Sequence, residues 1–237
     1  MPIICVLQDD PALARRLIPA ELPCASRRAL APVVSLPKGI FWPHERLPSG
    51  GDQLGMLLLE GMLLCASAVT DRPTVEVLGP GDVFRPFDAG DDRDATVFGE
   101  RRWWALRPAR IAVLDAGFTR AMCDHPAVIA ELAARLARRS AASSLRLALA
   151  AEPRLSTRLH DVMWQLARRF GQSEADGILL QVPLCHALLS WLAGARRPAV
   201  SRAVNELERT GLMAQRPDGT WWLARRQAVC LDQPVAA

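Results

Sequence analysis

The chain has 237 residues, of which 50% are hydrophobic and 23% are charged, and its formal net charge is +4. This length and composition suggest one large or two ordinary globular domains with a substantial core. No run of about 18 or more uncharged apolar residues occurs, so no transmembrane helix and no membrane partner are predicted. The segment Met1–Gln8 lacks a basic region and is followed by Asp9, so we expect no signal peptide and a cytoplasmic protein.

The charge is unevenly distributed along the sequence. Residues 1–152 carry 18 basic and 18 acidic side chains, whereas residues 153–237 carry 11 basic and 7 acidic ones. The whole net charge therefore lies in the second segment. Such a division indicates two modules, of which the second presents a surface to a polyanion.

The six cysteines and four histidines are dispersed, and no pair has the ligand spacing of a structural metal site. Isolated thiols such as Cys65, in the apolar run Leu63–Ala66, are expected to be reduced core residues. A jelly-roll enzyme of the cupin type would need a His-x-His pair with a glutamate, and the chain has no such set. We therefore predict no catalytic residues, no metal and no cofactor, and hence no enzyme.

From about Arg27 to Asp115, short runs of β-forming residues alternate with turn residues. Short strands at this spacing predict an antiparallel sandwich or jelly roll, which we place in residues 1–125. The predicted strands are Val33–Leu36, Gly55–Cys65, Thr74–Leu78 and Arg110–Leu114.

From Pro126 to about Leu149 the sequence lacks glycine and internal proline and is rich in helix-forming residues. Asp124 is the predicted N-cap, with Pro126 in the first turn. An apolar stripe is formed by Ile129, Leu132 and Leu136. One helix of about 35 Å leaves such a stripe uncovered, so residues 126–150 are predicted to pair with a second copy of the chain. The alternative is a helix that lies on its own sheet.

Residues 151–237 follow the order of a winged helix-turn-helix. A helix at Leu155–Phe170 and a strand at Ile178–Val182 precede two short helices, Leu184–Ala193 and Arg197–Arg209. Between the short helices, Ser190 allows close packing, and Gly194, four residues later, allows a left-handed turn. The fold class is thus α+β.

The second short helix has two faces. Val200, Val204 and Leu207 form a buried stripe, which leaves polar residues on the other side. Guanidinium groups near the helix N-terminus reach guanine edges in the major groove, while Arg196 and Ser201 are suited to phosphate. A Pro-Asp-Gly turn after Arg216 predicts a hairpin, the wing. The candidate DNA-binding residues are Arg196, Arg197, Pro198, Ser201, Arg202, Asn205 and Arg216.

Three stretches carry a resemblance to a known family: Leu78–Phe84, with its Gly-Pro-Gly-Asp turn, Leu189–Arg202 and Leu207–Leu212. Over nearly its whole length the chain resembles the Crp/Fnr family of bacterial transcription regulators. The resemblance implies a jelly-roll sensor like a cyclic-nucleotide-binding domain, a dimerisation helix and a winged helix-turn-helix. It also implies a homodimer that binds a palindromic operator in double-stranded DNA and acts with RNA polymerase.

The family's base-reading positions fall on Arg197, Pro198 and Arg202. The cyclic-AMP-responsive member has a glutamate at the middle position, where it contacts cytosine, and proline cannot accept that bond. The resemblance implies guanine and phosphate contacts for the two arginines. We therefore expect an operator that differs from the familiar one.

The sensor departs further from the family pattern. Cyclic-nucleotide binders continue after the turn with Gly-Glu, where this chain has Arg85-Pro86, which lacks both the carboxylate and one amide. The acidic residues within Asp88–Asp94 would repel a phosphodiester. We expect an unknown effector that is not a cyclic nucleotide; a cyclic-nucleotide- or haem-responsive regulator and a winged-helix protein-interaction scaffold are the alternatives. The candidate ligand-binding residues are Arg85, Arg93 and Thr96.

Overall fold

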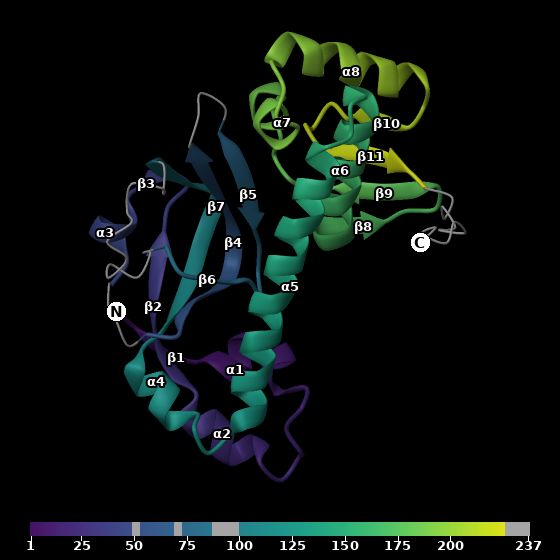
Figure 1. Ribbon diagram of the computed structural model, residues 1–237. Coiled ribbons are helices and arrows are strands. Elements are labelled where there is room, and N and C mark those ends of the chain that lie inside the picture. Colours follow the sequence, from purple (N-terminus) through teal and green to yellow (C-terminus); the bar gives the residue numbers. More distant parts are fainter. Residues whose placement is uncertain (49–52, 69–72, 87–99, 226–237) are drawn as a thin grey trace, which may run out of the picture. The chain divides into compact units, whose positions relative to one another are not determined.

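The computed structural model describes residues 1–48, 53–68, 73–86 and 100–225 (Figure 1). The chain divides into two compact units, Met1–Ala148 and Leu149–Ala237. Each unit combines an antiparallel sheet with helices, which confirms the predicted α+β class. Among the helices of the described ranges, none combines the length and the hydropathy that a membrane span requires.

The N-terminal unit is built on one antiparallel sheet, whose described strands run in the order β1-β2-β7-β4-β5. Two short strands join it at the side, β3 on β7 and β6 on β4. All four predicted strands lie within this sheet, in β2, β4, β5 and β7. The strands are β1 (Ile3–Cys5), β2 (Leu30–Leu36), β3 (Gly39–Phe41), β4 (Gly55–Ala68), β5 (Thr74–Leu78), β6 (Val83–Phe84) and β7 (Glu100–Leu114).

The two long strands β4 and β7 change register between Leu58 and Leu63. Gly61 lies at this irregularity with φ of 92°, a backbone conformation that favours glycine. A Cβ atom at this position would lie 2.2 Å from the carbonyl oxygen of Pro108. The close approach of the two strands therefore depends on a residue without a side chain.

Apolar side chains alternate between the two faces of β4, as expected for a strand buried on both sides. Leu57 and Leu59 belong to one buried cluster, and Met56 and Leu58 belong to another. Helices pack on the face of the first cluster, and Figure 1 shows α1, α2 and α4 near the start of α5. The helices of this unit are α1 (Val6–Asp9), the 3-10 helix η1 (Pro11–Ala14), α2 (Leu22–Arg28), α3 (Pro43–Arg46), α4 (Ala116–Ala121) and α5 (Pro126–Ala150), of which the last two residues belong to the C-terminal unit.

Helix α5 has the predicted extent, but its N-cap differs from the prediction. The helix begins at Pro126, so the residue before it is His125 and not Asp124. The carboxylate of Asp124 instead pairs with the guanidinium of Arg28, at the end of α2. The side chain of Asp124, which the sequence pattern predicts to cap α5, thus takes part in a long-range ion pair instead.

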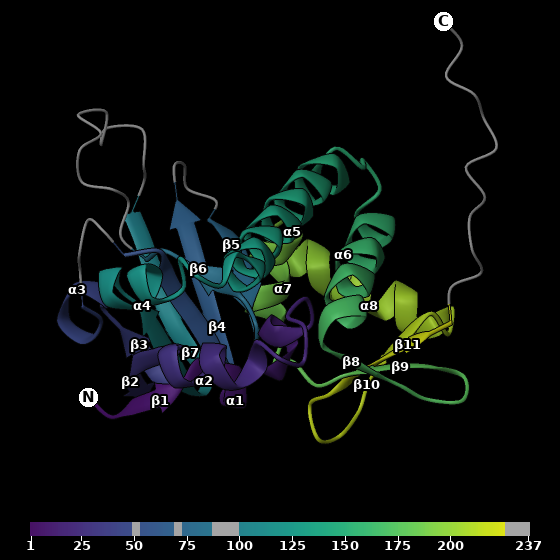
Figure 2. The same ribbon diagram turned by 90° about the horizontal axis from the view of Figure 1, so that it is seen from below.

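The C-terminal unit has a sheet with the strand order β10-β11-β9-β8, covered by three helices (Figure 2). The first and last of these helices have the predicted bounds, and the middle one begins two residues later and ends one residue earlier than predicted. The predicted strand Ile178–Val182 is found one residue earlier at its start and two residues earlier at its end. The elements are α6 (Leu155–Phe170), β8 (Gly171–Ser173), β9 (Gly177–Leu180), α7 (His186–Leu192), α8 (Arg197–Arg209), β10 (Met213–Gln215) and β11 (Trp221–Ala224).

Candidate functional site

The turn between α7 and α8 has the predicted geometry. Gly194 has φ of 60°, and the amide of Ala195 donates to the carbonyl of Ser190 at 2.9 Å, which closes the end of α7. Ser190 is buried, and its hydroxyl donates to the carbonyl of Ala187 at 2.6 Å.

Helix α8 is fixed by its apolar face and by the hairpin that follows. Val200, Val204 and Leu207 are buried, as predicted, and Ala203 joins them. Trp221 of the hairpin is fully buried, and its indole N–H donates to the carbonyl of Leu184 at 3.0 Å. The rotation of α8 about its axis is therefore determined by packing.

The opposite face of α8 carries the predicted polar side chains. Arg197 and Pro198 are exposed in the first turn, and Arg202 and Asn205 are exposed one and two turns later. Arg196, just before the helix, is exposed as well. Proline in the first turn costs no helical hydrogen bond, because the first amides of a helix have no intrahelical partner. The chain thus presents guanidinium and amide groups on one exposed surface.

Ser201 differs from its predicted neighbours in exposure and contacts. Its side chain is half-buried, and its hydroxyl lies 3.0 Å from Nδ1 of His186 at the start of α7. The two helices are therefore linked by a hydrogen bond beside the exposed arginines. His186 had no role in the sequence prediction, because nothing local indicates a partner 15 residues away.

The predicted hairpin is formed by β10 and β11, and we call the segment Met213–Ala224 the wing. Asp218 shapes its turn by accepting hydrogen bonds from the amide and hydroxyl of Thr220, which lower the pKa of the Asp218 carboxyl. The guanidinium of Arg216 binds both carboxylate oxygens of Glu174, at 3.1 and 2.6 Å. Glu174 lies between β8 and β9 and was not among the predicted site residues.

In the N-terminal unit, the Gly-Pro-Gly-Asp turn joins β5 to β6. The carboxylate of Asp82 accepts the amide of Gly79 at 2.8 Å, and Gly81 adopts φ of 88°. The amide of Gly81 and the carbonyl of Asp82 both bond to the backbone of Leu58, at 2.8 and 3.0 Å. The motif is therefore a rigid turn attached to the neighbouring strand β4.

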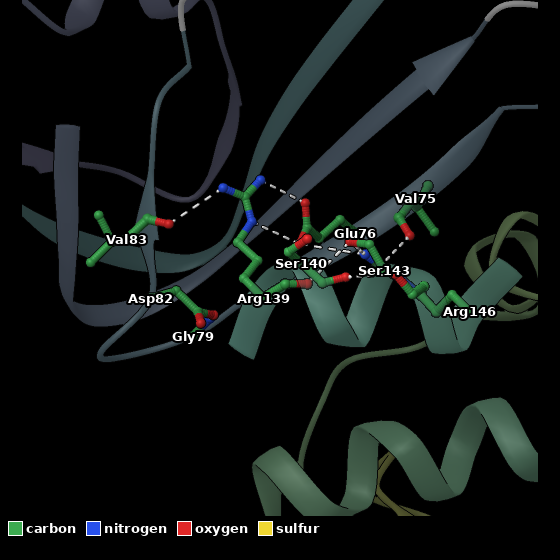
Figure 3. Close-up of polar contacts among 10 residues, drawn as sticks. Val75, Glu76, Gly79, Asp82, Val83, Arg139, Ser140, Ser143 and Arg146 are labelled. Carbon is green, nitrogen blue, oxygen red and sulfur yellow. Dashed lines mark hydrogen bonds and ion pairs between the residues drawn. The ribbon is translucent and has the colours of Figure 1, made fainter. Parts of the chain in front are cut away.

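Two arginines of α5, Arg139 and Arg146, bind the strands that face this helix (Figure 3). Arg139 donates to both carboxylate oxygens of Glu76 on β5, at 2.9 and 2.8 Å, and to the carbonyl of Val83 at 3.3 Å. Arg146 donates to the carbonyl of Val75 at 3.1 Å and lies 3.4 Å from Glu76. Glu76 is therefore shared by two guanidinium groups.

One turn earlier in α5, Arg135 is buried and links three parts of the unit. It donates to the carbonyl of Gly81 at 3.1 Å and pairs with the carboxylates of Asp10 and Glu131. Glu131 also accepts from Arg138 at 2.8 Å, and these hydrogen bonds lower its pKa. The helix is thus held to the Gly-Pro-Gly-Asp turn by charge as well as by apolar packing.

The predicted ligand-binding residues are only partly covered by the structure. Arg85 is exposed directly after β6, and Pro86 beside it is buried. Arg93 and Thr96 lie outside the described residues. Within the ranges that the structure describes, no three His, Cys, Asp or Glu side chains are grouped as metal ligands would be.

The prediction for the dimer interface is wrong at Leu132. This side chain is fully buried in the first cluster of its own unit, beside Val128, so it has no surface to offer a second chain. Ile129 and Leu136 pack against the same cluster but are only partly buried. The apolar stripe of α5 thus faces mainly its own sheet, which is the alternative interpretation of the sequence.

No protein-family model matches the chain, and no curated protein matches it by sequence. Its fold, however, is found among solved structures. A cyclic nucleotide-binding domain containing protein from Listeria monocytogenes superimposes with a TM-score of 0.67 at 14% identity, over 90% of this chain and 96% of that one. A mutant of CooA from Carboxydothermus hydrogenoformans gives 0.64 at 18% identity, over 90% of each chain.

A transcriptional regulator of the CRP/FNR family from Thermus thermophilus gives a TM-score of 0.57 at 20% identity, over 82% of this chain and 94% of that one. The likeness spans most of each protein. The chain therefore shares the fold of these proteins.

Proposed function

We propose that the chain is a sequence-specific DNA-binding transcription regulator of the Crp/Fnr type. The observation that carries the proposal is the division of α8 into two faces. Its apolar face is buried in the C-terminal unit, while Arg197, Arg202 and Asn205 are exposed. Guanidinium forks bind guanine edges and amides bind adenine edges in the major groove. A protein-interaction scaffold would have no need for such a set on one helix.

We propose further that two copies bind a palindromic operator, in contact with RNA polymerase. Helix α5 offers a surface for the second copy beside its buried face. Ile129, Leu136 and Leu147 are spaced by 7 and 11 residues, which places them on the same side of a helix. Leu147 is 76% exposed. This modified interface keeps two of the predicted residues and replaces Leu132 with Leu147.

The effector of the N-terminal unit is proposed not to be a cyclic nucleotide. Arg139 and Arg146 point from α5 toward β5, where an anion would meet them, but a carboxylate of the chain itself, Glu76, already pairs with both. A phosphodiester that entered there would have to displace this carboxylate.

The experiment for DNA binding selects bound sequences from random duplexes and then measures mobility shifts with the selected site. Arg197→Ala and Arg202→Ala should each weaken specific binding about 10- to 100-fold, since a bidentate base contact contributes about 1–3 kcal/mol of discrimination. Arg168→Ala removes the same charge from the exposed surface of α6 and serves as the matched control. Unchanged specific binding by both α8 variants would overturn the proposal.

For the effector, cyclic AMP and cyclic GMP are titrated calorimetrically into the full-length protein. We expect no binding heat at micromolar concentrations. Saturable micromolar binding of either nucleotide would overturn this part of the proposal and leave the DNA-binding part intact.

A further inference from the structure

The wing holds its arginine against a carboxylate rather than toward solvent. Arg216 begins the wing turn, and its guanidinium reaches Glu174 with two separate hydrogen bonds, from Nη1 to Oε1 at 3.1 Å and from Nη2 to Oε2 at 2.6 Å. The side chains are 41% and 33% exposed, so the pair lies at the surface. Solvent and ligands can therefore reach both partners.

Both residues are positioned by the backbone of their turns. The amide of Arg216 donates to the carbonyl of Thr220 at 2.9 Å, and the amide of Glu174 donates to the carbonyl of Gly177 at 2.9 Å. The backbone from which each side chain projects is therefore fixed. The pair is a defined contact between the wing turn and the β8–β9 turn.

The geometry of this contact is the one by which arginine binds phosphate. A guanidinium presents two parallel N–H groups that match two oxygens of a carboxylate or of a phosphate equally well. The N–H groups that bind Glu174 are not available to a phosphate at the same time. Glu174 also adds a negative charge beside the wing, which repels a DNA backbone.

We infer that Glu174 is an affinity-determining residue of the DNA-binding unit, because it competes with DNA phosphate for the guanidinium of Arg216. The inference rests on the proposed function. It changes the role predicted for Arg216: in the wild-type chain this arginine contributes little to DNA affinity, and loss of the Glu174 charge makes it a phosphate contact. The salt dependence of binding reports this change directly, since each neutralised phosphate adds about 0.9 to the slope of log affinity against log salt.

The experiment measures fluorescence anisotropy with a non-specific 30-base-pair duplex over a series of salt concentrations. Glu174→Gln keeps the size of the side chain and should steepen the slope by about 0.9 per chain, with roughly fivefold tighter binding at 0.1 M salt. Arg216→Gln leaves the Glu174 carboxylate without its partner and should weaken binding modestly, because an uncompensated negative charge then lies beside the wing. The double variant removes both charges and should have the wild-type slope. Glu174→Ala provides a second removal of the carboxylate.

Asp176→Asn is the matched control for the loss of a negative charge. Asp176 is exposed in the same turn as Glu174, and the substitution should leave the slope unchanged. The inference is overturned if Glu174→Gln has the wild-type slope, if its gain persists when Arg216 is also replaced, or if Asp176→Asn gives the same gain. Those outcomes leave the proposed function standing, whereas the absence of salt-dependent DNA binding in the wild-type protein would remove both.

Discussion

Arg139 on α5 and Glu76 on β5 form a bidentate ion pair, in which the guanidinium Nε and Nη2 lie 2.9 and 2.8 Å from the two carboxylate oxygens. The hydrogen bonds that Arg139 donates to Glu76 raise the pKa of the guanidinium above its already high usual value, so the pair stays charged. The partners are 63 residues apart in sequence. The contact therefore fastens the long helix to the sheet of the same chain.

Replacement of Glu76 by glutamine should loosen this attachment. We expect Glu76→Gln to lower the free energy of unfolding by about 1–3 kcal/mol, because two guanidinium groups lose a partner in a partly buried place. Urea unfolding followed by circular dichroism measures the change. Asp124→Asn, which breaks the exposed pair with Arg28, should cost less than about 1 kcal/mol. Equal losses in the two variants would show that Glu76 has no special role.

The proposed dimer surface is tested at Leu147. A charge at this exposed position should hinder a second chain without disturbing the core, so Leu147→Glu should raise the dissociation constant of the dimer at least about tenfold, or about 1.4 kcal/mol. Sedimentation equilibrium measures the constant. Leu145→Glu is the control, because Leu145 is 47% exposed on another side of α5. If Leu145→Glu dissociates the dimer and Leu147→Glu does not, the interface is assigned to the wrong side.

The buried carboxylate of Glu131 should make stability depend on pH. Hydrogen bonds from Arg138 and Arg135 hold its pKa below the ordinary value of 4.5. A carboxyl with a lower pKa in the folded state stabilises the fold above its unfolded pKa, and this stabilisation is lost as the pH falls through the folded pKa. Glu131→Gln should therefore cost about 1–3 kcal/mol at pH 7 and progressively less below pH 4.5.

Urea unfolding at several pH values between 7 and 3 measures this dependence. Glu45→Gln is the control, since Glu45 is exposed and its ion-pair contact is with His44 at 4.0 Å. A difference between wild type and Glu131→Gln that stays constant over this range would contradict the assigned pKa.

Cys65 should be chemically inert in the folded protein. Burial raises the pKa of its thiol to about 11, so almost no thiolate forms at neutral pH. Cys123 and Cys185 are exposed. Brief treatment with iodoacetamide at pH 7.5, followed by peptide mass spectrometry, should label these two and leave Cys65 unmodified until urea is added. Rapid labelling of Cys65 in the native state would contradict its burial.

The helices and the helix-turn-helix could be predicted from sequence because their signals are local. Pro198 in the first turn and Gly211 after the last turn mark the two ends of the helix Arg197–Arg209. The spacing of its apolar residues predicts which face is buried. The left-handed turn at Gly194 follows from residue type in the same way. Such features depend on neighbours within a few positions, so a single sequence contains them.

Contacts between distant residues could not be predicted in this way. The period of α5 identifies Leu132 as apolar and facing inward, but it does not say whether the covering surface is its own sheet or a second chain. Likewise, charge alone does not reveal that Arg216 pairs with Glu174, 42 residues earlier, or that Arg139 pairs with Glu76. The short helices α1 and α2 were also missed, because they contain too few turns for a period to appear.

The burial of Val128 and Leu132 within their own unit has a consequence for the order of assembly. Because α5 completes the core of a single chain, association is not required to cover its most apolar residues. For the proposed dimer, folding and association should then be separate equilibria, so dilution should yield a folded monomer instead of an unfolded one. The midpoint of thermal unfolding should accordingly vary little with protein concentration, unlike that of an obligate dimer.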